Sequence, residues 1–423
     1  MSWPGRRSGG DGNKRPLRVL LLDENAPVPA DRRVWYEALT LRDAGFEVSI
    51  VSPQRHYRRR YERLEGIDVY RFPLPSLGGI GGHFVEYAIA TPTMLAYSWF
   101  IFLARGFDII HAANPPDFLY WIARVFKPLG VRFVFDQHDA VPETCASRWT
   151  GMKFRRTDAI ARWTEQGSYR AADVVIAPNQ SLRRLALERG GVAPERVFVV
   201  RNAIRRTDFR DGQMRPELRR GRRYLVFYAG LIGPDDGLEQ LVLAARHVLL
   251  ERERRDVHFV IMGDGDCLGG IKQMTARLGL QDAIEFTGWC QDDRLMADYL
   301  ATADLCVAPD PKSPVSDLCS MNKIVEYMAM GKAVVAFDLK EAQETARGAG
   351  AYVASNGSSD PAAMGEEILE LLSSPERRQL MGRIGRQRFH EVLAWDHQRE
   401  NLLRAYEVML GRPATPDLLR STA

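Results

Sequence analysis

The feature that most constrains the fold is a pattern of short apolar strand, turn and amphipathic helix that runs twice along the chain. In most of these strands β-branched and aromatic residues follow one another almost without interruption, which is typical of parallel strands covered on both faces. The first series has strands at 17–24, 46–52, 67–73, 107–114, 131–139, 172–179 and 196–204, and the second at 224–230, 257–265, 283–289, 303–310, 333–339 and 350–355. The alternation predicts two α/β domains, each built on a doubly wound, Rossmann-like parallel sheet.

The break between the two series sets the expected domain boundaries. Residues 205–223 are polar, basic and free of strand patterns, so we expect a linker there. A chain of 423 residues is long enough for two separate cores. The predicted organisation is a disordered tail (1–15), an N-terminal domain (16–204), the linker, a C-terminal domain (224–390), a helix that crosses back to the N-terminal domain (391–412) and a second tail (413–423).

Composition excludes several other classes of protein. The net charge is only +4, and no dense basic run is interleaved with aromatic residues, so we expect no nucleic-acid partner. The five cysteines are scattered without metal-ligand spacing, which argues against a structural zinc site and favours a reducing compartment. The N-terminal stretch lacks the apolar core of a secretory signal. We therefore expect a cytoplasmic protein.

One segment raises the question of a membrane. Tyr87 to Ala104 carries no charged residue and is as long as the shortest membrane-spanning helices. Threonine, proline and serine dilute the run, and a strand follows it directly. These features favour a buried domain helix over a span, although the segment could still lie close to lipid at the inner membrane face.

Ligands of open parallel sheets bind beyond the carboxyl ends of the strands, so we look for function at those ends. In the second series, prolines keep residues 309–314 extended, and Ser320 is a favourable N-cap for a helix that ends at Gly331. Asn322 and Lys323 would lie in its first turn and Glu326 one turn further. A helix N-terminus with a lysine suits a diphosphate, and a carboxylate suits the ribose hydroxyls. The alternative is an exposed Lys323–Glu326 pair that only stabilises the helix.

In the first series, three strand ends carry polar side chains that would face an acceptor. His138, Asp139 and Glu143 follow one strand, and Asn114 and Asp117 follow the strand before it. Asp31 and Arg32 stand near a helix start after the first strand. A histidine there could lie against a sugar or share a proton, or it could simply bond a backbone carbonyl.

The Gly-Asp-Gly at residues 263–265 fits neither the P-loop nor the dinucleotide-binding spacing. We interpret Gly263 and Gly265 as turn glycines that let a helix N-terminus approach a ligand. No metal site and no other cofactor are expected.

Several segments, in this order along the chain, resemble the retaining family-4 glycosyltransferases of GT-B fold, in which two Rossmann-like domains face a central cleft. They are ANPPD, DQHD, GDG, FTGW, EYMAMGKAVVAFD and a terminal helix with a tryptophan, and the similarity extends from about Leu17 to Leu410. GPDDG and SMNKIVEYMAMGK are similar to a bacterial subgroup linked to surface-polysaccharide assembly.

The resemblance implies roles for individual residues. Glu326 corresponds to the second glutamate of the family's paired-glutamate motif and would contact the ribose, and His138 would lie beside the transferred sugar. Gly230 and Gly233 correspond to the loop that closes over the phosphates, and Gly263 and Gly265 to the turn that flanks the base. The family transfers with retention and without a catalytic metal, with the leaving phosphate accepting the proton of the acceptor.

Two departures limit this transfer. Leu318 stands where the family has its first glutamate, which makes Asp317 the expected substitute. The Arg and Lys that many members place after the first strand of the second domain are absent, because that turn reads LIGPDDG. We therefore assign the offsetting of phosphate charge to Lys323 and the helix end at Ser320.

The leading functional hypothesis is transfer of a sugar from a uridine or guanosine diphosphate sugar to a carbohydrate or lipid-linked acceptor in polysaccharide or cell-envelope synthesis. A GT-B-fold sugar-nucleotide epimerase and a catalytically weak, glycosyltransferase-like partner protein are the alternatives. The first would need no acceptor, and the second would bind no nucleotide sugar.

Overall fold

The computed structural model describes residues 15–75, 80–148, 151–206, 212–290, 292–355 and 359–411. The predicted tails therefore lie outside the described residues except for Arg15, and so does the 207–211 portion of the predicted linker. The chain divides into two compact units. Unit 1 comprises residues 1–202 with 398–423, and unit 2 comprises residues 203–397.

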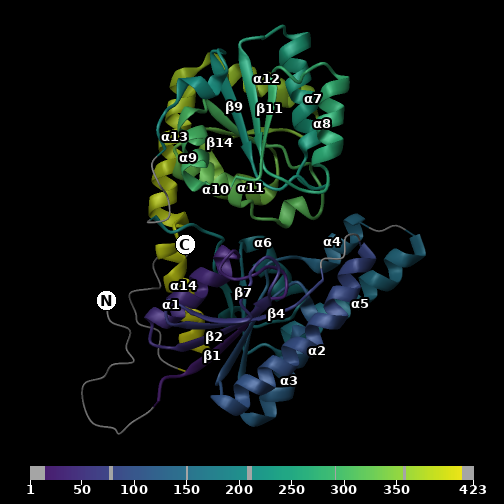
Figure 1. Ribbon diagram of the computed structural model, residues 1–423, viewed down its shortest axis with the longest axis vertical. Helices are drawn as coiled ribbons and strands as arrows, with labels where there is room; N and C mark the ends of the chain where they lie inside the picture. Colours follow the sequence, from purple (N-terminus) through teal and green to yellow (C-terminus); the bar gives the residue numbers. More distant parts are fainter. Residues whose placement is uncertain are drawn as a thin grey trace. The chain divides into compact units, whose positions relative to one another are not determined.

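Unit 1 is built on an eight-stranded sheet in the order β3-β4-β2-β1-β5-β6-β7-β8 (Figure 1). All neighbouring strands are parallel except β3 and β4. The strands are β1 (Arg18–Leu22), β2 (Glu47–Pro53), β3 (Tyr61–Leu64), β4 (Ile67–Phe72), β5 (Ile109–Ala113), β6 (Arg132–Asp136), β7 (Val174–Ala177) and β8 (Val197–Val199). The helices are α1 (Arg32–Asp43), α2 (Ile80–Ala104), α3 (Tyr120–Phe126), α4 (Val141–Arg148), α5 (Gly151–Ala171), α6 (Gln180–Glu188) and α14 (Trp395–Met409).

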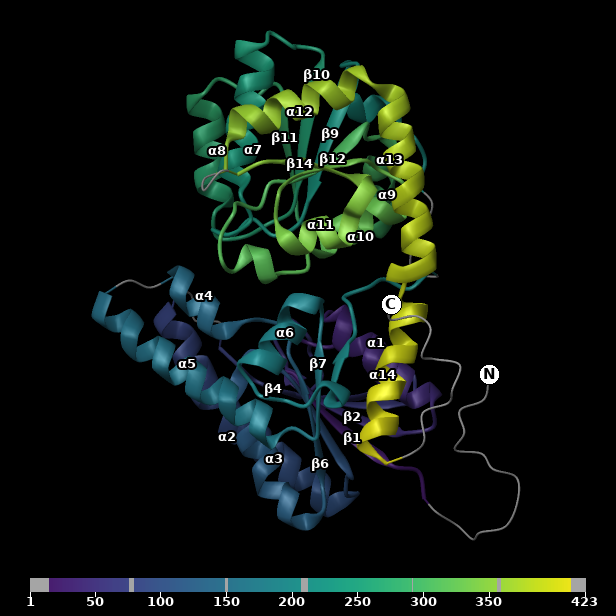
Figure 2. The same cartoon turned by 180° about the vertical axis from the view of Figure 1, so that it is seen from behind.

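Unit 2 is built on a six-stranded parallel sheet in the order β11-β10-β9-β12-β13-β14. The strands are β9 (Tyr224–Ala229), β10 (Val257–Met262), β11 (Ile284–Gly288), β12 (Leu305–Ala308), β13 (Val334–Phe337) and β14 (Gly350–Val353). The helices are α7 (Leu238–Arg246), α8 (Leu268–Arg277), α9 (Asp293–Thr302), α10 (Asn322–Ala329), α11 (Lys340–Ala346), α12 (Pro361–Ser373) and α13 (Pro375–Arg388). Figure 2 shows α12 crossing in front of this sheet. The two Rossmann-like parallel sheets confirm the predicted fold class.

The strand orders locate the place where each sheet can take a ligand. In unit 1 the order reverses between β1 and β5, and in unit 2 between β9 and β12. Connections leave such a pair of strands in opposite directions, which opens a crevice at their carboxyl ends. The polar strand-end residues singled out in the sequence follow β1, β5 and β6 in unit 1, and β9, β10 and β12 in unit 2.

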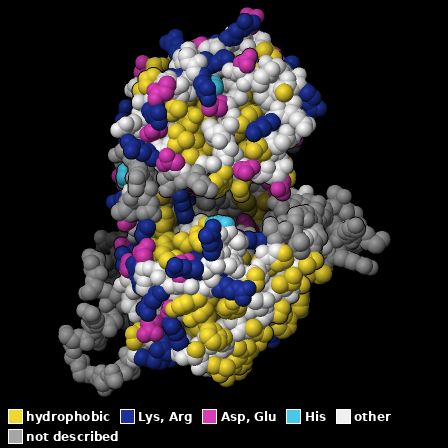
Figure 3. Space-filling model, in the orientation of Figure 1, with side chains coloured by type: hydrophobic (Ala, Val, Ile, Leu, Met, Phe, Trp, Pro, Cys, Tyr) yellow, Lys and Arg dark blue, Asp and Glu magenta, His cyan; other side chains and the backbone are white. Residues whose placement is uncertain are grey.

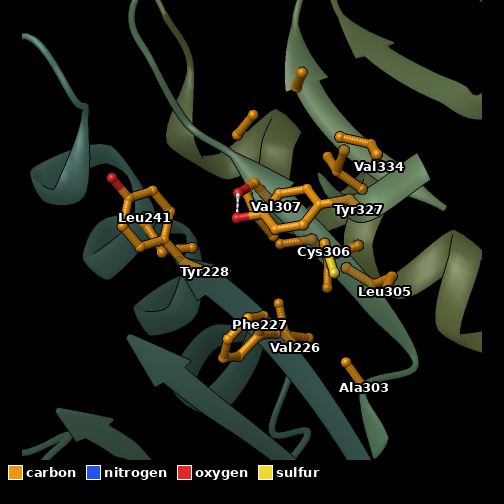
Figure 4. Close-up of a cluster of buried hydrophobic side chains, with 14 of the residues drawn as sticks. Val226, Phe227, Tyr228, Leu241, Ala303, Leu305, Cys306, Val307, Tyr327 and Val334 are labelled. Atoms are coloured by element: carbon orange, nitrogen blue, oxygen red, sulfur yellow. Dashed lines mark hydrogen bonds between the residues drawn. The ribbon is translucent and has the colours of Figure 1, made fainter. Parts of the chain in front are cut away.

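The core of unit 2 fixes α10 beneath the candidate site (Figure 4). Tyr327 of α10 is fully buried, and its hydroxyl accepts a hydrogen bond from the backbone N–H of Ala229 at 2.9 Å. The same hydroxyl lies 3.5 Å from the carbonyl oxygen of Val307. One side chain thus ties α10 to the ends of both strands that flank the reversal point, β9 and β12.

The predicted return of the terminal helix to the first domain is confirmed. Residues 398–409 of α14 belong to unit 1, and α14 runs beside α1 and β2 in both views (Figures 1 and 2). Tyr406 is fully buried, with its ring 5.5 Å from that of Phe46 and its hydroxyl 2.9 Å from Nδ1 of His111. Leu402 and Tyr406 of this helix are both fully buried and form part of the interior of unit 1.

The expectation that Tyr87 to Ala104 is a buried helix is wrong. The segment is helical within α2, but only 22% of its most apolar window is buried within the structure. Hydropathy measures how apolar a helix is, whereas burial depends on how much neighbouring surface the fold supplies. By length and composition alone, α2 is the one described helix that could cross a membrane.

Candidate functional site

The site in unit 2 begins with two strand-end loops, after β9 and β10, that pack backbone to backbone. The N–H of Gly230 donates to Met262 O at 3.1 Å, and that of Ile232 donates to Asp264 O at 3.0 Å. A Cβ on Gly263 would stand 1.9 Å from Gly230 O, and one on Gly265 would stand 2.6 Å from Ile232 O. Because of these contacts with the neighbouring loop, no residue with a Cβ fits at either position. This differs from the predicted role, in which the glycines make room for a ligand or a helix end.

Gly233 lies in the next turn of the same loop. Its N–H donates to the carboxylate of Asp236 at 3.0 Å, which closes the turn of the GPDDG segment. Leu231 at the tip has 62% of its surface exposed. The loop after β9 is thus held at its base by backbone contacts, while its tip is open to solvent.

Helix α10 begins at Asn322, one residue later than predicted. Its N-cap is Met321, which makes no capping side-chain hydrogen bond, so the prediction that Ser320 caps the helix is wrong. The preference of serine for this position is worth only about 1 kcal/mol. Met321 is buried in the core of unit 2, and this packing fixes where the helix starts.

The residues of α10 divide as the spacing predicts, with one exception. Ile324, Val325, Tyr327 and Met328 form the buried face, Asn322 is exposed and Glu326 is half-buried. Lys323 is the exception, because only 9% of its surface is exposed. The alternative of an exposed, helix-stabilising Lys323–Glu326 pair is therefore wrong.

Lys323 belongs to a buried network of acidic partners. Its Nζ lies 2.8 Å from Asp310 Oδ1, 3.3 Å from Asp236 Oδ1 and 3.4 Å from the hydroxyl of Tyr228. Burial alone would lower the pKa of Lys323, but Asp310, Tyr228 and Asp236 together raise it above its ordinary value. Lys323 is therefore a permanent cation, and carboxylates already offset its charge. Its assignment as the group that neutralises a diphosphate stays a prediction.

Asp317, the expected substitute for the missing glutamate, lies in a short 3-10 turn before α10. Its Oδ1 accepts a hydrogen bond from the N–H of Lys340 at 3.0 Å and lies 2.9 Å from Nζ of Lys312. The carboxylate is thus engaged in joining this turn to the start of α11.

The site in unit 1 is organised around a buried ion pair that the sequence analysis missed. Arg33 of α1 donates from Nη2 to Asp136 Oδ1 at 2.7 Å, and from Nη1 to the carbonyl of Val200 at 2.7 Å. Burial alone would raise the pKa of Asp136, but Arg33 and the adjacent imidazoles hold it well below its ordinary value. The signal for this pair was available, since Arg33 and Glu37 stand four residues apart on the inner face of a helix that should be apolar there.

This ion pair orients His138. Nε2 of His138 lies 2.6 Å from Asp136 Oδ2 and 3.0 Å from Nε of Arg33. Because Asp136 is ionised, we place the proton of the ring on Nε2, where it is donated to the carboxylate. In the neutral ring this leaves Nδ1 as the acceptor. The Nε–H of Arg33 is then donated to Asp136 Oδ2, 3.2 Å away, and not to the ring. The ring of His138 is therefore held by charged side chains, whereas the alternative was a ring that bonds a backbone carbonyl. Its orientation suits it to accept a hydrogen bond from a sugar hydroxyl.

Behind His138 lies a second layer of buried titratable groups. His111 Nε2 lies 3.5 Å from Glu37 Oε2 and 3.6 Å from Asp136 Oδ2. Burial lowers the pKa of His111, and burial together with Asp136 raises that of Glu37. The ligand atoms of Glu37, His111 and Asp136 lie within 4.8 Å of one another, which could suit a metal ion. Arg33 already supplies the cation here, 3.3 Å from Glu37, so we interpret the group as a proton-sharing network.

The remaining predicted acceptor-side residues join neighbouring loops. Asn114 accepts hydrogen bonds from the N–H groups of His138 at 2.5 Å and Asp139 at 3.1 Å, and donates to Asp117 at 2.6 Å. Asp117 is buried, which together with Glu165 raises its pKa. Glu143 is 2.5 Å from Arg189. The structure thus brings Asn114, Asp117, His138 and Asp139 together and places Glu143 in an ion pair.

Two predicted residues and one missed residue lie after β1. Asp31 is the N-cap of α1 and accepts from Val34 N at 3.1 Å, and Arg32 is the first residue of that helix, as predicted. The sequence analysis missed Glu24, whose Oε1 is buried with no hydrogen-bond partner in the described part of the chain. Burial raises the pKa of Glu24 to about 8, although Arg55 opposes this. Glu24 can therefore donate a proton or a hydrogen bond near neutral pH.

Each of the two units contains a segment that matches a known protein family. Residues 30–203 match the glycosyl transferase 4-like domain, and residues 222–374 match the glycosyl transferases group 1. The chain is a family-4-like, group 1 glycosyltransferase. The two matched segments cover the strand-end loops after β5 and β6 in unit 1 and those after β9, β10 and β12 in unit 2.

Individual relatives agree with the assignment. The glycosyltransferase is 25% identical to the α-D-kanosaminyltransferase of Streptomyces kanamyceticus over 62% of this chain and 66% of that protein, just under two thirds of its length. Sucrose-phosphate synthase from Thermosynechococcus elongatus has a similar fold, with a TM-score of 0.72 and 16% identity over 93% of this chain and 99% of that one. HepE from Anabaena, solved in complex with UDP-glucose, gives a TM-score of 0.68 at 16% identity over 93% and 100%. These structures establish the GT-B fold.

Proposed function

We propose that this glycosyltransferase moves a sugar from a uridine diphosphate sugar to a carbohydrate or lipid-linked acceptor, with retention of configuration and without a catalytic metal. The observation that carries the proposal is the set of glycine-rich strand ends beside α10, at the reversal point of the sheet in a unit that matches the group 1 transferases. The complex of HepE with UDP-glucose favours uridine over guanosine as the base. We further propose that the enzyme works in the cytoplasm at the inner face of the membrane, in cell-envelope glycan synthesis.

In this proposal Glu326 contacts the ribose. It lies one turn into α10, off the buried face, and is half-buried at the edge of the site. Asn322 is exposed at the first turn of the same helix. His138 stands in the unit that would receive the acceptor, with Nδ1 as the acceptor atom of its neutral ring.

A thermal-shift series with UDP, UDP-glucose, GDP and GDP-mannose tests the donor. A ligand at a hundred times its dissociation constant stabilises the folded protein by about 2.7 kcal/mol, so the correct base should be evident. We expect Glu326→Ala to abolish the shift given by UDP, while Glu370→Ala, on the exposed side of α12, retains it. Equal UDP affinity in both variants would remove Glu326 from the ribose.

Product analysis tests the reaction. Consumption of the donor only when an acceptor is added supports transfer, whereas a new sugar nucleotide formed without acceptor would show an epimerase. Activity that survives a chelator supports metal independence, and the anomeric configuration of the product, read by NMR, tests retention. A protein that no nucleotide sugar stabilises would instead be the catalytically weak partner.

A further inference from the structure

One face of α2 is apolar and exposed from Val85 to Ala104. The exposed positions described on it are Val85, Ala88, Ile89, Pro92, Ala96, Trp99, Phe100, Leu103 and Ala104. Their spacing of three to four residues defines a single stripe on a helix. Leu103 at the end of this stripe has 79% of its surface exposed and Phe100 has 59%. A helix on the surface of a soluble protein usually turns its charged residues to water, and α2 turns apolar ones.

The exposed apolar surface continues onto two neighbouring helices. The ring of Trp99 in α2 lies 4.7 Å from that of Phe126 in α3, and Trp121 in α3 lies 6.1 Å from Trp163 in α5. Figure 3 shows hydrophobic side chains gathered over these three helices. We call this surface the apolar band, and its large exposed members are Val85, Ile89, Trp99, Phe100, Leu103, Trp121, Val125, Leu129, Ile160 and Trp163.

The charges beside the apolar band are mostly positive. The exposed charged side chains described on α3 and α5 are Arg124, Arg162 and Arg170. The guanidinium of Arg124 lies 5.4 Å from the ring of Trp121. Asp158, the half-buried acidic residue here, is paired with Arg162 at 2.9 Å. The surface thus combines exposed aliphatic and indole side chains with three exposed arginines, one of which is paired with Asp158.

We propose that the apolar band docks unit 1 on the surface of a bilayer that contains anionic lipids. The opposite face of α2 packs into the core of unit 1 through Ala90, Met94 and Ile101, so the helix can lie on the membrane but cannot leave the fold to span it. Tryptophans and arginines beside an apolar surface suit the headgroup region, where each indole keeps one end wet. A second copy of the chain would bring the arginines of both copies together, whereas anionic headgroups supply the opposite charge.

Sedimentation of the full chain with vesicles tests the surface. We expect binding to phosphatidylcholine mixed with phosphatidylglycerol, weaker binding to phosphatidylcholine alone, and loss of the difference at high salt. Leu103→Glu and Ile160→Glu, on separate helices, should each lower the partition coefficient about tenfold or more, because each takes a large apolar side chain out of the contact. Leu380→Glu on α13 of unit 2 is the matched control, since Leu380 is 50% exposed and outside the apolar band.

Three results would overturn the proposal. They are no vesicle binding, equal partition of Leu103→Glu and Leu380→Glu, and a wild-type dimer that Leu103→Glu dissociates without any vesicle binding. The proposal rests on the membrane location proposed above but not on the donor chemistry. The UDP thermal shift, measured on the same samples, keeps the two apart: an intact shift without vesicle binding refutes the docking surface alone, and a missing shift refutes the donor.

Discussion

At the scale of single residues, the ion pairing of Lys323 decides how its function can be tested. Substitution of Lys323 alone leaves the buried carboxylate of Asp310 without its main partner. In comparable buried pairs, the loss of one partner costs about 3–5 kcal/mol of stability. A loss of activity in that variant would therefore reveal little about phosphate binding.

We expect Lys323→Met to lower the melting temperature strongly, and Lys323→Met with Asp310→Asn to recover most of the loss, because the pair is then neutral on both sides. If Lys323 offsets phosphate charge, the double variant should remain slower than the wild type by two or more orders of magnitude, the range of about 10²–10³ seen when one transition-state donor is removed. Turnover that returns together with stability would assign Lys323 a purely structural role.

Glu24 should make stability fall as the pH rises. Its folded-state pKa of about 8 lies above the ordinary value of 4.5, so its contribution is fully present below pH 4.5 and is lost as the pH passes through 8. Glu24→Gln removes this loss. We expect the two proteins to melt at similar temperatures near pH 4.5. Above pH 8 the variant should be more stable, by up to about 5 kcal/mol, since each unit of pKa difference between the folded and unfolded states is worth about 1.4 kcal/mol. Parallel melting curves across this range would show that Glu24 ionises normally.

Residue identity alone could predict some of this chemistry and not the rest. His138, Asn114 and Asp117 were found because strand ends of parallel sheets collect ligands, and the structure brings all three together. Arg33 and Asp136 were missed because a single charged residue within the apolar pattern of a helix or strand does not by itself indicate a functional site. The two residues of this pair are more than a hundred residues apart, so the spacing of Arg33 and Glu37 could show a charged inner face of α1 but could not identify Asp136 as the partner.

At the scale of elements, the loops after β9 and β10 show what the glycines are for. Gly263→Ala places a Cβ 1.9 Å from the carbonyl oxygen of Gly230, so the two loops must separate. We expect a loss of about 1–3 kcal/mol, the cost typical of overpacking, and weaker nucleotide binding. Gly270→Ala on α8 is the control, because its Cβ would meet nothing within 4 Å and alanine favours a helix. Denaturant unfolding of both variants checks this, and equal stability would mean that the loops are not in contact.

Prediction of whole elements succeeded where burial dictates composition. The predicted strands correspond to β1, β2 and β4–β14, since strands covered on both faces must be apolar. β3 was missed because its sequence, Tyr-Glu-Arg-Leu, is short and polar, and none of its four side chains is fully buried. The start of α10 was misplaced because core packing of Met321 outweighed a small capping preference.

At the scale of the whole molecule, α14 makes unit 1 discontinuous along the chain. Unit 2 is one uninterrupted stretch, 203–397, and unit 1 needs residues from both ends. We expect a fragment of residues 203–397 to unfold cooperatively on its own. A fragment of residues 1–202 should be less stable than unit 1 in the full chain, because it lacks the fully buried Leu402 and Tyr406.

A peptide of residues 395–411 should restore stability to the 1–202 fragment, and the same peptide with Tyr406→Ala should restore much less, since the ring packs on Phe46 and bonds His111. Thermal unfolding followed by circular dichroism measures both. A 1–202 fragment that melts at one temperature with or without the peptide would mean that α14 is dispensable for unit 1.

The same discontinuity orders events during synthesis. The ribosome makes the first 202 residues, then all of unit 2, and only then the helix that completes unit 1. A nascent chain can therefore finish its second half before its first, although domains usually mature in the order in which they emerge. Unit 1, which is completed later, also carries α2 with its exposed apolar face. The nascent chain therefore needs a chaperone, or a nearby lipid surface, most before α14 leaves the exit tunnel.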